Sequence, residues 1–138
     1  KLLCLDAYDN ERWKSVERSL LRVFSEYGLP DAILSDNGPP WADHTNGYTP
    51  YEIWMMQLGI LPMHGRALHP QTQGKEERFH RTLKQDVLKR HTIRDLVEAQ
   101  SIFDHYREEY NVERPHAALN YDVPEKHYRS SARKLPST

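Results

Sequence analysis

Residues 27–38 read YGLPDAILSDNG, and they carry the clearest fold signal in this sequence of 138 residues. Gly28-Leu29-Pro30 predicts the end of a helix, because glycine readily adopts the backbone that ends a helix and proline cannot continue one. Residues 32–35 (AILS) are an apolar run too short for a helix, which favours a buried strand. Asp36-Asn37-Gly38 is typical of a turn. A carboxylate is therefore expected where this strand ends.

Helices and a second strand are predicted around this first strand. Upstream, apolar residues recur at helical spacing over 13–27, which predicts a helix. Downstream, residues 38–48 (GPPWADHTNGY) are typical of a loop. TPYE at 49–52 combines an N-cap residue, a proline at the first helical position and an acid three residues after the cap, so a helix should continue to Leu58. Residues 60–64 then predict another strand.

The remaining segments alternate in the same way. Residues 1–7 (KLLCLDA) contain a short apolar run and predict a strand. Residues 66–74 predict a loop, which is followed by a helix from about 75 to 90. TIRD at 92–95 resembles a capping box and should open a further amphipathic helix. Strands that alternate with helices indicate an α/β fold.

Composition excludes several classes of protein. Nineteen basic residues balance twenty acidic ones, so neither a polybasic protein nor an acidic tail is indicated, although a local basic face is still compatible with nucleic-acid binding. No apolar run approaches the roughly eighteen residues of a membrane span. The single cysteine, Cys4, favours a reducing cytoplasm and is expected to be a buried structural thiol. The histidines lack the spacing and cysteine partners of a zinc site.

Two acids in the predicted elements are candidates for a metal site. Asp36 lies at the carboxyl end of a strand, where α/β sheets bind ligands, although an aspartate in such a turn often bonds only its own backbone. On the helix over 75–90, Glu77, Arg81 and Lys84 share one face, which is also compatible with a merely solvated surface. The order of elements can bring Asp36 and Glu77 together, and clustered carboxylates favour Mg²⁺.

These segments resemble the catalytic core of DDE transposases and retroviral-type integrases, particularly bacterial insertion-sequence transposases. The matching text is YGLP at 27–30, SDNG at 35–38, HPQTQGKEERFHRTLK at 69–84, and Tyr110-Asn111 with Arg114-Pro115-His116 and Ala118-Leu119. The resemblance implies a ribonuclease H-like fold, with a mixed sheet flanked by helices. It also implies a transposase or integrase that uses Mg²⁺ or Mn²⁺ to cleave DNA at transposon ends and to join those ends to target DNA.

The resemblance assigns roles to individual residues. Asp36 would be the second acid of the metal-binding triad and Glu77 the third, with Glu76 as the adjacent alternative. Lys84 would match the lysine that contacts DNA ends. Contacts with DNA are expected from Lys84, Arg81, His69, Gln73 and Lys75.

The chain departs from the family's pattern at its start. The family's first acid lies on a first strand that is followed by a hairpin strand, whereas residues 1–7 lead directly into a helix and resemble the third strand. Asp6 is therefore a poor candidate for the first acid. We expect a catalytic core over 1–128 that is N-terminally incomplete, with an upstream hairpin carrying the first Asp, and we expect this chain alone to be inactive. A flexible tail is expected over 129–138.

Two alternatives stay open at this point. The chain could be a metal-dependent nuclease of the same fold, or a non-catalytic DNA-binding or oligomerisation fragment. Trp41 could stack on a base or pack on the core. The partners expected are transposon-end and target DNA and further copies of the chain, with no membrane, in the bacterial cytoplasm at the nucleoid.

Overall fold

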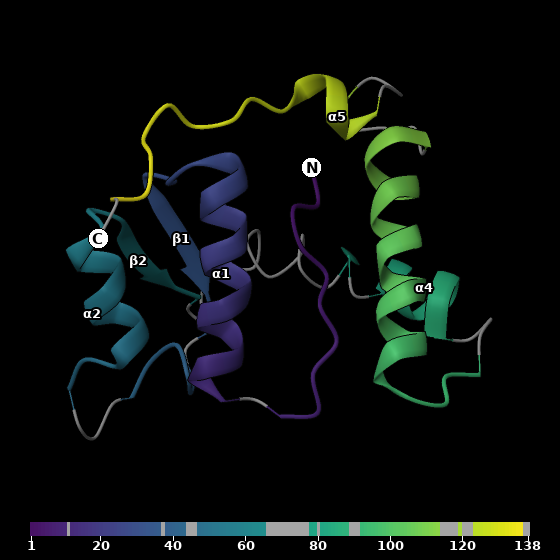
Figure 1. Ribbon diagram of the computed structural model, residues 1–138, viewed down its shortest axis with the longest axis horizontal. Helices are drawn as coiled ribbons and strands as arrows, with labels where there is room; N and C mark the ends of the chain where they lie inside the picture. Colours follow the sequence, from purple (N-terminus) through teal and green to yellow (C-terminus); the bar gives the residue numbers. More distant parts are fainter. Residues whose placement is uncertain are drawn as a thin grey trace. The chain divides into compact units, whose positions relative to one another are not determined.

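The computed structural model describes residues 1–10, 12–36, 38–43, 47–65, 78–79, 81–88, 92–113, 119 and 123–136. The chain divides into two compact units, Asn10–Phe79 with Ser131–Thr138 and Lys1–Asp9 with His80–Ser130. The elements in chain order are α1 (Trp13–Tyr27), β1 (Ala32–Ser35), α2 (Pro50–Gln57), β2 (Leu61–His64), η1 (Lys84–Leu88), α4 (Leu96–Glu108), η2 (Glu109–Glu113) and α5 (Pro124–His127) (Figure 1). No helix in the described ranges has the length and apolar character needed to cross a membrane.

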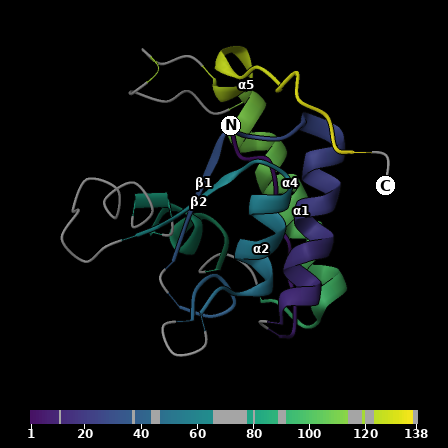
Figure 2. The same cartoon turned by 90° about the vertical axis from the view of Figure 1, so that its left-hand side faces the viewer.

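The first unit is built on a parallel pair of strands. β1 and β2 pair from Ala32 with Leu61 to Ser35 with His64, and α2 lies between them in the chain, because parallel strands need a crossover connection. Both strands alternate between exposed and half-buried residues. Ser35 and His64 are on the half-buried face, and α1 and α2 lie on one side of the strand pair in Figure 2.

The predictions for α1, β1, α2 and β2 are confirmed. α1 ends at Gly28, whose φ of 85° lies in the left-handed region that favours glycine. α2 begins with the predicted capping box, in which Thr49 and Glu52 each accept a hydrogen bond from the other's backbone N–H. The sequence therefore specifies where both helices of this unit stop or start.

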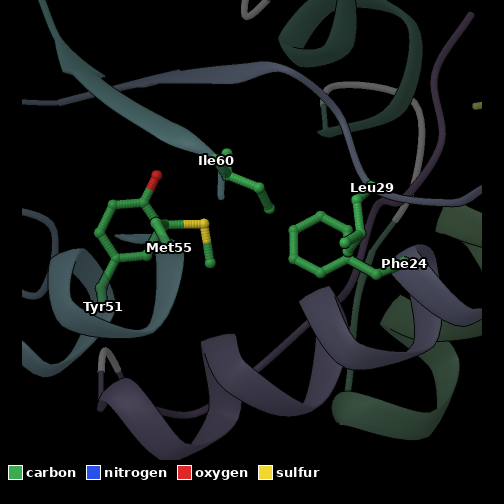
Figure 3. Close-up of a cluster of buried hydrophobic side chains, with 5 residues drawn as sticks. All are labelled: Phe24, Leu29, Tyr51, Met55 and Ile60. Atoms are coloured by element: carbon green, nitrogen blue, oxygen red, sulfur yellow. The ribbon is translucent and has the colours of Figure 1, made fainter. Parts of the chain in front are cut away.

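A small apolar core joins these elements. It consists of Phe24 from the last turn of α1, Leu29 just after that helix, Tyr51 and Met55 from α2, and Ile60 before β2 (Figure 3). Trp41 packs edge-on against Tyr51, with ring centroids 5.0 Å apart and an interplanar angle of 86°. Trp41 therefore packs on the core, which settles the alternative that the sequence left open.

Residues 131–135 close the carboxyl ends of α1 and α2. The Ser131 N–H donates to the Tyr27 carbonyl at 2.8 Å, and the Leu29 N–H donates to the Arg133 carbonyl at 2.8 Å. The Arg133 guanidinium donates to the carbonyls of Leu58 and Gly59 at 2.9 and 3.0 Å. These bonds supply partners for carbonyls that a helix end leaves unpaired.

In the second unit, the first segment of the chain differs from its prediction. Residues 1–7 were expected to form a strand, and this is wrong, since no strand is present there. The backbone of this segment is instead held by side chains of α4 and η2. Asn111 accepts from the Leu2 N–H and donates to the Leu2 carbonyl, both at 2.7 Å, and Gln100 does the same at the Ala7 N–H and the Leu5 carbonyl. Side-chain amides thus replace the sheet ladder that the apolar run suggested.

The helices of this unit follow the predicted pattern with one shift. Within the predicted helix over 75–90, residues 81–83 of this unit are helical and continue into the π-helical η1. Residues 78–79, which belong to the first unit, are also helical. α4 is capped by Asp95, which accepts from the Glu98 N–H at 2.8 Å. The cap is therefore the last residue of TIRD rather than its threonine, because Asp95 has extended backbone and Glu98 lies three residues beyond it.

Candidate functional site

Asp36 lies where the sequence placed it, directly after β1 and at the carboxyl end of the parallel pair. Its side chain is exposed, and within the described residues no hydrogen bond or ion pair engages its carboxylate. An accessible carboxylate is a hard oxygen donor of the type that Mg²⁺ and Mn²⁺ bind. Asp36 is therefore suited to hold one side of a divalent cation.

Two polar side chains from the strand ends meet beside Asp36. Ser35 Oγ lies 3.1 Å from His64 Nδ1, and the same nitrogen lies 3.2 Å from the Asp36 backbone oxygen. The Gly65 N–H donates to the Ser35 carbonyl at 2.7 Å. The backbone from which Asp36 emerges is thus tied to the end of β2.

Glu52 binds the other side of the histidine ring. His64 Nε2 lies 3.1 Å from Glu52 Oε2, and these side chains are only 19% and 12% exposed. The other carboxylate oxygen, Oε1, accepts from the Thr49 N–H at 3.0 Å and from the Thr49 hydroxyl at 3.1 Å. Burial by itself raises the pKa of Glu52, but the hydrogen bonds from Thr49 and His64 outweigh it and lower the pKa. Glu52 is therefore a fixed, ionised acceptor.

The order Ser35, His64, Glu52 has the residue types of a hydrolase triad, but its surroundings differ. The Ser35 hydroxyl lies 3.4 Å from the carbonyl oxygens of Asp36 and Met63. Acyl transfer needs N–H donors where an oxyanion develops, whereas the contacts given above for this hydroxyl are with two carbonyl oxygens and a ring nitrogen. The arrangement is suited to holding the two strand ends together.

The predicted DNA-binding residues are only partly described. Arg81 and Lys84 are both exposed, and Lys84 begins η1. These two residues belong to the unit that contains α4, whereas Asp36 belongs to the unit with the strand pair. The other predicted site residues, Glu76, Glu77, His69, Gln73 and Lys75, lie outside the described residues.

The structure brings Asp36 together with residues that the sequence did not single out for function. In the described part of the chain, no three His, Cys, Asp or Glu side chains gather into a metal-binding group. Glu52 was predicted only as a capping residue, and His64 was considered only for zinc. The position of His64 at the end of its strand could have indicated the contact with Ser35, because two parallel four-residue strands aligned end to end pair Ser35 with His64.

Comparison with known proteins shows which family and which relatives this sequence is similar to. Residues 58–124 match the integrase core domain family. The resemblance seen in the sequence is confirmed by this match and by proteins of bacterial insertion elements. The uncharacterized 31.7 kDa protein of insertion element IS407 from Burkholderia multivorans is 28% identical over 109 residues. An uncharacterized protein of insertion element IS136 from Agrobacterium fabrum is 31% identical over 105 residues.

The chain spans only part of these relatives. The alignments cover 79% and 75% of this chain, but only 38% of the IS407 protein and 51% of the IS136 protein. The chain therefore spans about half or less of the length of the curated relatives it matches.

A solved structure shows the same fold. The catalytic core domain of BIV integrase superposes with a TM-score of 0.65 and 24% sequence identity, covering 88% of this chain and 73% of that domain. The predicted ribonuclease H-like α/β fold is confirmed by this likeness.

Proposed function

We propose that this chain forms part of the catalytic core of a DNA transposase that cleaves transposon ends and joins them to target DNA, using Mg²⁺ or Mn²⁺. The observation that carries the proposal is the exposed carboxylate of Asp36 at the carboxyl end of the parallel strands. It is supported by the integrase core match over residues 58–124 and by relatives from insertion elements.

The proposed metal ligands are Asp36 and Glu77. Asp36 offers an accessible oxygen donor, and Glu77 is assigned by its place in the motif HPQTQGKEERFHRTLK. A divalent cation, when bound, neutralises phosphate charge and supports both the attacking and the leaving oxygen of an in-line displacement. Asp36 and Glu77 would fix the position of the cation relative to the DNA. No residue of this chain is proposed as the first acid.

The proposed DNA contacts are made by basic and polar residues. Arg81 and Lys84 are exposed and three residues apart, which places them next to each other on a helix. Their cationic groups would pair with phosphates and orient the DNA end. His69, Gln73 and Lys75 would contribute further contacts from their place in the same motif.

The proposed reaction has two balanced steps. In the first, water attacks the phosphorus at the transposon end, the bond from phosphorus to the 3′ oxygen breaks, and a 3′ hydroxyl is released. In the second, that hydroxyl attacks a phosphodiester of the target DNA, a new P–O bond forms and a target 3′ hydroxyl leaves. Neither step needs a covalent bond to the protein, so the side chains act by positioning and by charge.

We infer that the chain works with transposon-end DNA, target DNA and other copies of itself. Bacterial insertion elements supply the related proteins, so the bacterial cytoplasm at the nucleoid is the proposed location.

The test uses the protein encoded by the complete reading frame, a labelled transposon end and a target plasmid. Asp36→Asn and Glu77→Gln should each abolish both cleavage and joining, while the exposed Glu26→Gln on α1 should retain both activities. Cleavage without any joined product from the unmodified protein would favour a nuclease instead. Activity that survives both acid substitutions would overturn the assignment of the site.

A further inference from the structure

Glu52, His64 and Ser35 form a hydrogen-bonded chain that ends at the residue directly before Asp36. We propose that Glu52 and His64 are positioning residues that hold Asp36 in place for a divalent cation, without touching the cation themselves. The inference rests on the proposed role of Asp36 as a metal ligand, and it adds a second layer to that site.

The chain is anchored at Glu52. The capping box fixes this side chain, because Oε1 accepts from the Thr49 backbone N–H and from the Thr49 hydroxyl. The Thr49 hydroxyl oxygen in turn accepts from the Glu52 N–H at 3.1 Å. With Oε1 bound at the start of α2, the geometry leaves Oε2 directed at His64. An element of secondary structure, rather than a mobile loop, therefore sets the position of the carboxylate.

Glu52 then determines which nitrogen of His64 carries hydrogen. A carboxylate can only accept, so the proton facing Oε2 is on Nε2. In the neutral ring, Nδ1 is then an acceptor, and the Ser35 hydroxyl at 3.1 Å is placed to donate to it. A carboxylate that fixes the tautomer and orientation of a histidine is a recurring way of tuning a site from outside its first layer of ligands.

The third step links the ring to Asp36. His64 Nδ1 accepts from the hydroxyl of Ser35, the residue before Asp36, and the Gly65 N–H donates to the Ser35 carbonyl. Ser35 and His64 are the last register pair of β1 and β2, so these bonds tie the strands just where the ladder ends. The Asp36 carboxylate takes no part in them, which leaves it available to a cation.

The test measures Mn²⁺ binding to the 138-residue chain by paramagnetic broadening of the Asp36 and Gly38 amide signals. The key variant is Glu52→Gln. The Thr49 N–H keeps the amide oxygen of the glutamine at the cap, so the amide nitrogen faces His64 and forces Nε2 to accept. The ring hydrogen then moves to Nδ1, which can no longer accept from the Ser35 hydroxyl. The nitrogen chemical shifts of the imidazole in alkaline buffer report this change of tautomer directly. Matched variants are Ser35→Ala, Asp36→Asn and Glu26→Gln, the last an exposed acid on α1.

We expect Glu52→Gln to switch the His64 tautomer and to weaken Mn²⁺ binding about tenfold, the lower end of the effect of removing an outer hydrogen bond at a metal site. Ser35→Ala, which removes a single bond, should weaken binding in the same direction, and Glu26→Gln should change nothing. Unchanged Mn²⁺ affinity in both Glu52→Gln and Ser35→Ala, alongside abolished binding in Asp36→Asn, would overturn the positioning role alone. Equal affinity of Asp36→Asn and the unmodified chain would overturn the metal site and the positioning role together.

Discussion

Ser35 and His64 are opposite each other at the last position of the parallel strand pair, and Ser35 Oγ lies 3.1 Å from His64 Nδ1. This contact gives the end of a short sheet a defined geometry, because parallel pairing alone leaves the terminal residues free to fray. Glu52 fixes the ring from the other side, at 3.1 Å from Nε2. The residue that follows Ser35 is the proposed metal ligand Asp36.

The lowered pKa of Glu52 predicts that the free energy of unfolding decreases at acidic pH. Because folding lowers the pKa of Glu52 below its ordinary value of 4.5, its ionised form contributes stability at neutral pH, and this contribution is lost as pH falls below about 4.5 toward the folded-state pKa. Urea unfolding at a series of pH values should show the loss in the unmodified chain and a smaller loss in Glu52→Gln. Parallel curves for the two proteins between about pH 3 and 7 would contradict this.

Gly28 is expected to resist substitution. Its φ of 85° strains any residue with a Cβ, and a Cβ there would lie 2.5 Å from the Ser131 carbonyl oxygen and 2.8 Å from that of Arg133. Gly28→Ala should therefore cost more than about 1 kcal/mol of unfolding free energy. Gly38→Ala is the matched control, since nothing lies within 4 Å of its Cβ position. Equal stability of the two variants in urea unfolding would show that the contact with residues 131–133 is absent in solution.

The sequence predicted that Thr92 caps α4, whereas Asp95 is the cap in the structure. Asp95 accepts from the Glu98 N–H, so Asp95→Ala should lower the unfolding free energy by about 1 kcal/mol. Thr92 is exposed and three residues earlier, so Thr92→Ala should stay within about 0.5 kcal/mol of the unmodified chain. A larger loss for Thr92→Ala would restore the predicted capping box.

The predictable parts of this chain are those governed by local chemistry. α1 ends at Gly28 and α2 begins at Thr49 because a glycine and a capping box act within a few residues. The segment over 1–7 was assigned wrongly because an apolar run specifies burial but not its partner, and here the partners are side chains such as Asn111. The contact of Glu52 with His64 was missed because it depends on how a helix start meets a strand end twelve residues later.

Asn111 provides a direct test of how residues 1–7 are held. This buried side chain bonds both backbone groups of Leu2. Asn111→Asp keeps the size and the acceptor but removes the donor, so it should destabilise the fold by about 1–3 kcal/mol, the cost of an unsatisfied buried group. The Leu2 carbonyl is left without this donor while the Leu2 N–H keeps an acceptor. Urea unfolding measures the change, and unchanged stability would show that the segment is held in another way.

Substitutions of Arg81 and Lys84 test whether their exposed helix face binds DNA. Both side chains are exposed, and a cation that neutralises a phosphate releases a counterion, so the logarithm of affinity falls as the logarithm of salt concentration rises. Replacing Lys84 or Arg81 with Glu should weaken binding of the chain to duplex DNA and reduce the salt slope by about one for each phosphate that is no longer neutralised. Lys14→Glu, on the exposed face of α1, changes the net charge equally and should leave the slope unchanged. Fluorescence anisotropy across a salt series measures both quantities. If all three variants behave alike, overall charge rather than this face governs binding, and the proposed DNA contacts are wrong.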